Sequence, residues 1–282
     1  MRWAVLVIVV ALSGCLQANP EWNIQTEDGA RFASYHIPEG DGPFPLLIAL
    51  HGGLGTPRSM MDKSQFDTWA DQEGFIVVYP EGMDRTWNAG HCCGKARDQN
   101  RDDVAFLEAV IDKVRSEHEI SRIGVTGHSN GAMMAYRFAA ERSEVDFVAV
   151  VAGAIGGQKN AFADPYEIPA PGRPVEVVII HARDDPNVPY NGGSGPESVD
   201  PLRIDRSVDD AVAFWTQANQ ATLAHTSQEG DVTWERYEGM ADVTLISTLG
   251  GHGWPGSAKQ IALTDNPAAP DASEEIVRSF LD

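Results

Sequence analysis

Basic residues are scarce in this 282-residue chain: 21 lysines and arginines stand against 41 acidic residues, which gives a formal net charge of −20. A surface of that sign repels the phosphates of nucleic acid and the headgroups of anionic lipids, so we expect neither as a partner. The chain also lacks a P-loop and a dinucleotide-binding fingerprint after its first strand, so we expect no cofactor. The composition is that of an acidic, exported protein.

Long hydrophobic runs are missing from the N-terminus, where the apolar run covers only residues 3–12. Crossing a bilayer takes about 20 residues, so this run predicts a signal peptide and not a membrane span. It ends in Leu12-Ser13-Gly14-Cys15, which resembles the lipobox of bacterial lipoproteins; an ordinary secretory signal with an incidental cysteine is the alternative. We expect residues 1–14 to be removed, and 15–282 to be exported and either lipid-anchored to the cell envelope through Cys15 or secreted.

Cysteine is rare as well, with three in the whole chain. If Cys15 carries lipid, only the neighbours Cys92 and Cys93 remain. Thiols outside the cytosol tend to oxidise, and a vicinal disulfide and two free thiols both stay open. We expect no metal site, because tetrahedral zinc takes four ligands and only His91 lies near the cysteine pair.

Short apolar runs alternate with helical patterns, without an internal repeat or a long linker. Such runs are typical of strands that are buried on both faces of a parallel sheet. They cover residues 45–50, 75–79, 123–126, 145–151, 175–180 and 243–246. Apolar residues at helical spacing mark 102–118 and the stretch after Ser129, and a closing helix is expected over 273–281. The pattern predicts a single α/β domain over 15–282: a mostly parallel sheet with helices on both faces.

Three local patterns complete this picture. Residues 22–36 alternate polar and apolar side chains around Asp28-Gly29, which predicts an exposed antiparallel hairpin. The pair Asp102-Asp103 begins a helix, where carboxylates stabilise the positive end of the dipole. Only 23 residues, 152–174, separate two of the predicted strands, which leaves no room for a large cap domain. In open parallel sheets ligands bind beyond the carboxyl ends of the strands, and we expect an open site there.

A serine stands between two glycines in the stretch 124–134, GVTGHSNGAMM. Strand-forming residues precede Ser129 and helix-forming residues follow it, so it lies in a tight strand-to-helix turn. The pattern G-x-S-x-G in this setting is typical of a nucleophile elbow, in which Gly127 and Gly131 leave room for the serine to project above the sheet. We expect the neighbouring His128 to point away. A plain Ser-Asn-Gly turn is the alternative.

A serine nucleophile needs a base, and the base needs an acid that orients it. In this fold the chain order is serine, acid, histidine, and the histidines after Ser129 that could serve as base are His181, His225 and His252. His252 lies between glycines in a loop after the strand 243–246, so its ring can reach the serine. His181 precedes the candidate acids, and His225 lies in a polar connector. We therefore predict His252 as the base.

The acid and the oxyanion donors follow from the ends of other strands. Asp184 and Asp185 both come directly after one predicted strand, and the residues alone do not separate them. A developing oxyanion needs two N–H donors. The amide that follows the nucleophile, that of Asn130, is one; the second is expected from the glycine-rich loop 51–55, where we favour Gly53.

With these residues in place, the chain resembles the polyhydroxybutyrate depolymerase-like esterases, which border on feruloyl and acetylxylan esterases. The matching segments are LHGG (50–53), VVYPEG (77–82), TWNAGHCCG (86–94), DDVAFLEAVID (102–112), VTGHSNGAMMAYR (125–137), DPNVPYNGG (185–193) and GGHGWPG (250–256). The resemblance implies an α/β-hydrolase fold and identifies Asp185, which opens DPNVPY, as the acid. Family members often carry a cysteine where this chain has Gly53, and that departure favours a disulfide between Cys92 and Cys93.

The resemblance implies a serine esterase that works through an acyl-enzyme. Its main expectation is 3-hydroxyalkanoate oligomers or polymer as substrate, with feruloyl or acetylxylan esters as the alternative; a peptidase or a non-catalytic binding module on the same fold would be a different class. Soluble oligomers or smaller esters are favoured over crystalline polymer, because no polymer-binding module follows the closing helix. Asn88 and Trp254 fall in matching motifs, and we expect them to contact substrate, ordinary packing being the alternative.

Overall fold

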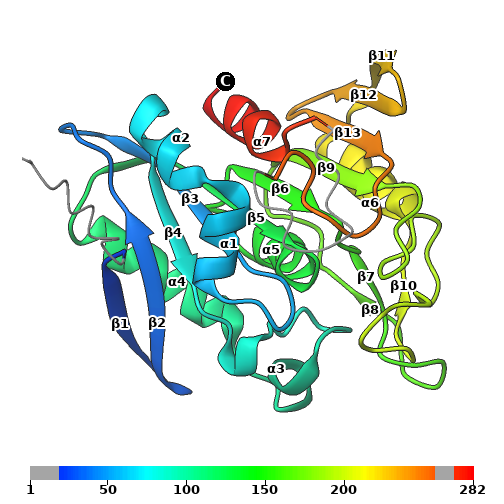
Figure 1. The fold of residues 1–282 in the computed structure, drawn as a ribbon, viewed down its shortest axis with the longest axis horizontal. Coiled ribbons are helices and arrows are strands. Elements are labelled where there is room, and N and C mark those ends of the chain that lie inside the picture. The colour runs from blue at the N-terminus through cyan, green and yellow to red at the C-terminus, as the bar shows by residue number, and fades with distance from the viewer. Residues whose placement is uncertain (1–18, 258–269) are drawn as a thin grey trace, which may run out of the picture.

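A ten-stranded sheet forms the centre of the molecule in a computed structural model that describes residues 19–257 and 270–282 (Figure 1). Its strand order is β1-β2-β4-β3-β5-β6-β9-β13-β12-β11. These strands are β1 (Glu21–Thr26), β2 (Gly29–His36), β3 (Phe44–Leu50), β4 (Ile76–Pro80), β5 (Ile120–His128), β6 (Phe147–Val151), β9 (Glu176–Ala182), β11 (Thr222–Glu229), β12 (Val232–Glu238) and β13 (Val243–Thr248). A small second sheet, in the order β10-β7-β8, consists of β7 (Gly156–Gln158), β8 (Tyr166–Glu167) and β10 (Ile204–Asp205).

The middle of the large sheet is parallel and both of its edges are antiparallel. Strands β4, β3, β5, β6, β9 and β13 pair in parallel. All six predicted apolar strands are found there, with β5 longer than its prediction. The hairpin predicted over residues 22–36 is formed by β1 and β2, and β2 pairs antiparallel with β4. The segment between β6 and β9 carries only β7 and β8, so it forms no large cap domain.

Helices cover both faces of the sheet (Figure 1). They are α1 (Pro57–Ser64), α2 (Phe66–Glu73), α3 (Gly94–Asp98), α4 (Asp103–Arg115), α5 (Asn130–Glu141), α6 (Val208–Asn219) and α7 (Ala272–Leu281), with a 3-10 turn η1 (Met83–Arg85). Within the described ranges, none of the helices has the length and apolarity that a membrane crossing requires.

The division of the core follows from the strand period. Along β3, Leu46 and Ile48 share one hydrophobic cluster with α4, α5 and α6, whereas Leu47 and Ala49 share the other with α1, α2 and α7. Successive side chains on a strand point to opposite faces, so a wholly apolar strand packs against helices on both sides. This is the observed α/β hydrolase architecture, and it leaves the carboxyl ends of the parallel strands free to carry functional loops.

One part of the sheet was not expected from the sequence. His225, predicted to lie in a polar connector, is on β11, which pairs antiparallel with β12 and forms the edge opposite β1 (Figure 1). Every residue of β11 is exposed. A strand without a buried face has no apolar alternation for a sequence to reveal. Backbone pairing with β12 places β11 in the sheet.

The start of α4 combines a cap with a buried ion pair. Asp102 is the N-cap residue, and its Oδ1 accepts a hydrogen bond from the amide of Ala105 at 2.9 Å. Asp103 is fully buried and lies 2.8 Å from Arg31 Nη2 on β2, while its Oδ2 accepts from the amide of Asn88 at 2.6 Å. Both residues thus lie at the start of α4 as expected, and Asp103 in addition joins three segments of the chain.

Replacing these two aspartates separates the two roles. We expect Asp103→Ala to lower the free energy of unfolding by about 3–5 kcal/mol, because it leaves Arg31 buried without its partner. Asp102→Ala removes one cap and is expected to cost about 1 kcal/mol. Urea denaturation of both variants measures the difference. Equal small losses would contradict the role of Asp103 as a buried anchor.

Candidate active site

Ser129 lies at the sharp turn between β5 and α5, with φ of 55° and ψ of −119°. A non-glycine residue rarely adopts such a positive φ. Its amide donates to the carbonyl of Val151 at 2.9 Å, which fixes the turn to β6. A Cβ on Gly127 would lie 2.4 Å from the carbonyl carbon of Gly131, and one on Gly131 would lie 2.4 Å from the oxygen of Leu50. Only glycine at both positions permits this close approach of α5 to β5 and β3.

A chain of two hydrogen bonds connects Ser129 to a carboxylate. His252 Nε2 lies 2.8 Å from Ser129 Oγ, and His252 Nδ1 lies 2.8 Å from Asp185 Oδ2. A carboxylate only accepts, so Nδ1 carries the ring proton and Nε2 accepts from the serine hydroxyl. The three residues come from the ends of β5, β9 and β13, as the chain order predicted. The arrangement can take a proton from the serine and stabilise the imidazolium that results.

The two neighbouring aspartates that the residues alone left unresolved have different surroundings. Asp185 is buried, and its Oδ1 accepts from the amides of Asn187 and Val188 at 2.8 and 2.9 Å. Burial raises its pKa, but hydrogen bonds from His181 and His252 outweigh burial and hold the pKa of Asp185 well below its usual range. Asp184 is exposed and accepts instead from the amides of Gly250 and Gly251 at 2.9 and 3.0 Å. It fixes the loop that carries His252, without touching the imidazole.

Two further histidines hold the acid and the base of the catalytic triad in position. His181 Nε2 donates to the carbonyl of Val188 at 2.8 Å and lies 3.4 Å from Asp185 Oδ2, which orients the acid. His128 was expected to point away from the site, and this was wrong: it lines the pocket, and its Nε2 donates to the carbonyl of His252 at 3.1 Å. Burial, with further repulsion from Lys63, lowers the pKa of His128 well below its ordinary value, so it is a neutral support at physiological pH.

The residues that carry the two predicted oxyanion donors are neighbours in the pocket wall. Gly53 and Asn130 both line it, and a Cβ built on Gly53 would lie 3.7 Å from the Cβ of Asn130. Asn130 is the first residue of α5, where backbone N–H groups have no intrahelical acceptor. In the part of the chain that the structure describes, neither of the two amides has a hydrogen-bond acceptor. Two unused N–H groups beside a serine hydroxyl are suited to a developing negative charge.

The side chain of Asn130 connects this part of the pocket wall to the loop after η1. Its Oδ1 accepts from the amide of Trp87 at 2.7 Å and its Nδ2 donates to the carbonyl of Trp87 at 3.0 Å. The Trp87 indole in turn donates to the carbonyl of His51, the first residue of the glycine-rich loop, at 2.9 Å. No sequence pattern predicts this role of Trp87, because a buried tryptophan in a loop is ordinary core composition.

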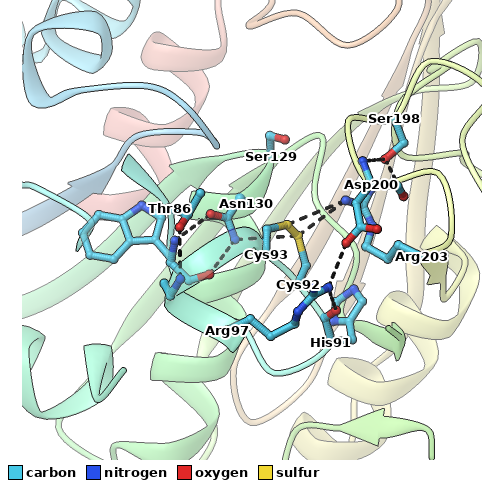
Figure 2. Close-up of a disulfide and its surroundings, with 12 residues drawn as sticks. Thr86, His91, Cys92, Cys93, Arg97, Ser129, Asn130, Ser198, Asp200 and Arg203 are labelled. Atoms are coloured by element: carbon cyan, nitrogen blue, oxygen red, sulfur yellow. Dashed lines mark hydrogen bonds and ion pairs between the residues drawn. A yellow bond between two sulfur atoms is a disulfide. The ribbon is translucent and has the colours of Figure 1, made fainter. Parts of the chain in front are cut away.

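The pocket that opens onto Ser129 has a volume of about 460 Å³. Cys92 and Cys93 form a disulfide beside it, and Figure 2 shows this disulfide between Asn130 and the charged residues Asp200 and Arg203. Cys93 is part of the pocket wall, as are Leu54 and Val199. Of the two alternatives that the sequence left open, the structure has the vicinal disulfide and not two free thiols.

Two predicted substrate contacts are corrected. Asn88 is buried, and its Nδ2 donates to the carbonyl of Arg101 at 3.0 Å, so it holds a loop together. Trp254 is fully buried and donates from its indole to Ser273 Oγ at 3.0 Å. Neither side chain lines the pocket. Ordinary packing, the alternative for both, describes them correctly.

Two other sequence predictions concern lipid and metal. Cys15 lies outside the described residues, so its lipid attachment and the export of the chain stay predictions. Among the residues that the structure covers, no group of three or more His, Cys, Asp or Glu side chains could hold a metal ion.

Comparison with known proteins gives the class. The chain is 28% identical over 240 residues to NocK of Nocardia uniformis subsp. tsuyamanensis, named as an esterase, covering 78% of this chain and 67% of that protein. It is 25% identical to a protein of Aspergillus niger named as feruloyl esterase C, covering 84% and 78%. The solved structure of an acetyl xylan esterase from Aspergillus awamori superposes with a TM-score of 0.60 at 14% identity, over 93% of this chain and all of that one. No family model matches the chain.

Fold and relatives together define the protein first as an α/β hydrolase. Within that class the chain is a carboxylic ester hydrolase, related in sequence to feruloyl esterases. This excludes the non-catalytic binding module as its principal role. The ester that it cleaves is a narrower question, which depends on the pocket.

Conservative replacement of the two aspartates tests which one serves His252. We expect Asp185→Asn to lower kcat by about 10³–10⁴-fold, because the amide does not stabilise the imidazolium as a carboxylate does. Asp184→Asn keeps an oxygen that can accept from Gly250 and Gly251, so we expect a loss below about tenfold. Steady-state kinetics on one activated ester compares the pair. A larger loss of kcat for Asp184→Asn than for Asp185→Asn would contradict the assignment of Asp185 as the acid.

Proposed function

We propose that this chain hydrolyses feruloyl-type esters of carbohydrate, with Ser129, His252 and Asp185 as the catalytic residues. The observation that carries the proposal is the hydrogen-bonded chain from Asp185 through His252 to Ser129. Its serine end lies in a pocket far larger than the reacting ester group needs. The geometry supplies nucleophile, base and orienting acid at hydrogen-bond distance, which is what acyl transfer requires.

The reaction proceeds in two steps. Ser129 Oγ attacks the ester carbonyl while its proton passes to His252 Nε2, and the carbonyl oxygen becomes an oxyanion held by the amides of Gly53 and Asn130. Collapse of this intermediate expels the alcohol, which takes the proton from His252, and leaves an acyl-serine. Water then attacks the acyl-serine with the same base, and the acid is released. Asp185 stays ionised throughout and stabilises the imidazolium in both steps.

The choice of ester rests on the relatives and on the size of the pocket. One relative that matches over most of both chains, the Aspergillus niger protein, is named as a feruloyl esterase. The pocket of about 460 Å³ falls within the usual range for a drug-sized ligand, so an aromatic acyl group has room. Its wall combines the Leu54 and Val199 side chains with a disulfide, which suits an aromatic ring, and charged groups, which suit a polar alcohol.

Other esters remain alternatives to test. Short acetyl esters of xylan use the same chemistry, but an acetyl group leaves most of the pocket unfilled. The 3-hydroxyalkanoate oligomers expected from the sequence resemblance have less support, because the relatives described above are named for other activities or for esterase activity in general. Peptide amides are disfavoured for the same reason.

A substrate panel with a matched inactive variant tests the proposal. Wild-type residues 16–282 and Ser129→Ala are assayed on methyl ferulate, a feruloylated arabinose, acetylated xylo-oligosaccharides, 3-hydroxybutyrate trimer and a peptide amide. We expect the highest kcat/KM on the feruloyl esters, and a fall of more than about 10⁴-fold in Ser129→Ala, because the triad acts as a unit. A clear preference for the 3-hydroxybutyrate trimer would overturn the proposed substrate while leaving the mechanism intact.

A further inference from the structure

The pocket beside Ser129 has a second, polar side that the mechanism does not use. Ser129, Asn130 and the glycine-rich loop form one side, and Arg97, Asp200 and Arg203 line the other. Figure 2 shows the Cys92–Cys93 disulfide between the two groups. A substrate whose ester carbonyl lies at Ser129 and whose remainder crosses the disulfide therefore meets charged side chains.

Arg97 and Asp200 form a pre-arranged pair on this polar side. Arg97 Nη1 lies 2.8 Å from Asp200 Oδ2, and the two side chains are 13% and 23% exposed, so both are partly open to the pocket. Arg97 Nη1 also donates to the carbonyl of His91 at 3.1 Å. The amide of Asp200 donates to Ser198 Oγ at 3.2 Å. The Arg97 side chain is thus held by a backbone carbonyl and the backbone of Asp200 by a neighbouring side chain, which lowers the entropic cost of using the pair for binding.

The pair keeps hydrogen-bonding capacity for a ligand. Among the described residues, Asp200 Oδ1 has no hydrogen-bond partner, while Oδ2 is taken by Arg97. A partly exposed carboxylate oxygen beside a guanidinium offers an acceptor next to a donor. Adjacent hydroxyl groups, which donate and accept at once, match such a pair.

Arg203 holds the disulfide that lies between the two sides of the pocket. It is 4% exposed, and its Nε and Nη2 each lie 2.8 Å from an oxygen of Asp205. Its Nη1 reaches the sulfurs of Cys92 and Cys93 at 3.4 and 3.7 Å, and its Nη2 donates to the carbonyl of Asn187 at 3.2 Å. Arg203 therefore ties the disulfide to the loop of the catalytic acid, so the distance between nucleophile and polar side is set by rigid contacts.

The charges of this side select the ligand class. An anionic group would be repelled by the carboxylate of Asp200, which lines the pocket. A cationic group would be repelled by Arg97 and Arg203. A purely apolar group would strip water from the ion pair without replacing its hydrogen bonds, which is costly. A neutral group with several hydroxyls meets none of these penalties.

We propose that Arg97 and Asp200 form a subsite that binds the hydroxyl groups of the sugar in a carbohydrate ester. The subsite rests on the proposed function and extends it, since it assigns the alcohol part of the substrate to named residues. Val199, 76% exposed beside Asp200, lines the same pocket and can contact the apolar face of a sugar ring. The disulfide between this subsite and Ser129 supports the link between sugar and acyl group.

The test compares two esters that share one acyl group and differ only in the alcohol. Wild type, Asp200→Ala and Arg97→Leu are assayed on methyl ferulate and on feruloylated arabinose. Each variant removes one or two hydrogen bonds to charged groups, so we expect the ratio of kcat/KM for the sugar ester to that for the methyl ester to fall about tenfold. The change should appear mainly in KM for the sugar ester.

Asp98→Ala is the matched control, since it removes another carboxylate partner of Arg97 that does not line the pocket; its ratio should stay that of wild type. Equal losses on both esters in Asp200→Ala and Arg97→Leu, or no change in the ratio, would overturn the subsite. If the wild type cleaves no feruloyl ester, the proposed function fails on its own. In that case the ratio of kcat/KM for acetylated xylose to that for ethyl acetate is measured in the same variants. A fall of about tenfold in Asp200→Ala and Arg97→Leu supports the subsite, and an unchanged ratio overturns it.

Discussion

Close contact between the start of α5 and the ends of β5 and β3 is the constraint on which the site depends. The helix begins so near to both strands that side chains at Gly127 and Gly131 would collide with backbone atoms. This contact holds Ser129 at a positive φ and brings the amide of Asn130 beside Gly53. Nucleophile and oxyanion donors are therefore placed by the same packing, and the strain at Ser129 is balanced by a sheet whose strands are buried on both faces.

Around this centre, each reacting group is held by a neighbour that does no chemistry itself. Asp184 and His128 hold the loop of His252 through its backbone. His181 orients Asp185. The Asn130 side chain connects the pocket wall to the backbone of Trp87. Most of these contacts end on backbone atoms, which cannot drift with a rotamer. Such support keeps the groups within the narrow tolerances that acyl transfer requires.

Much of the fold and of the site could be predicted from the sequence, because the relevant signals are local. Wholly apolar strands, the glycines around Ser129 and the glycine-flanked His252 each report their own environment. What failed depends on tertiary contacts. The exposed strand β11 carries no apolar pattern, and the buried Asn88 and Trp254 adjoin site motifs in sequence but face the interior. Arg97 and Asp200, 103 positions apart, become neighbours only through the fold.

Covalent labelling shows directly whether His252 activates Ser129 as a nucleophile. A fluorophosphonate probe reacts only with an activated serine, and mass spectrometry of the digested protein locates the adduct. We expect a single adduct on Ser129 in the wild type, and its loss in a folded His252→Ala variant. Absence of an adduct from the folded wild type, or labelling that persists without His252, would contradict it.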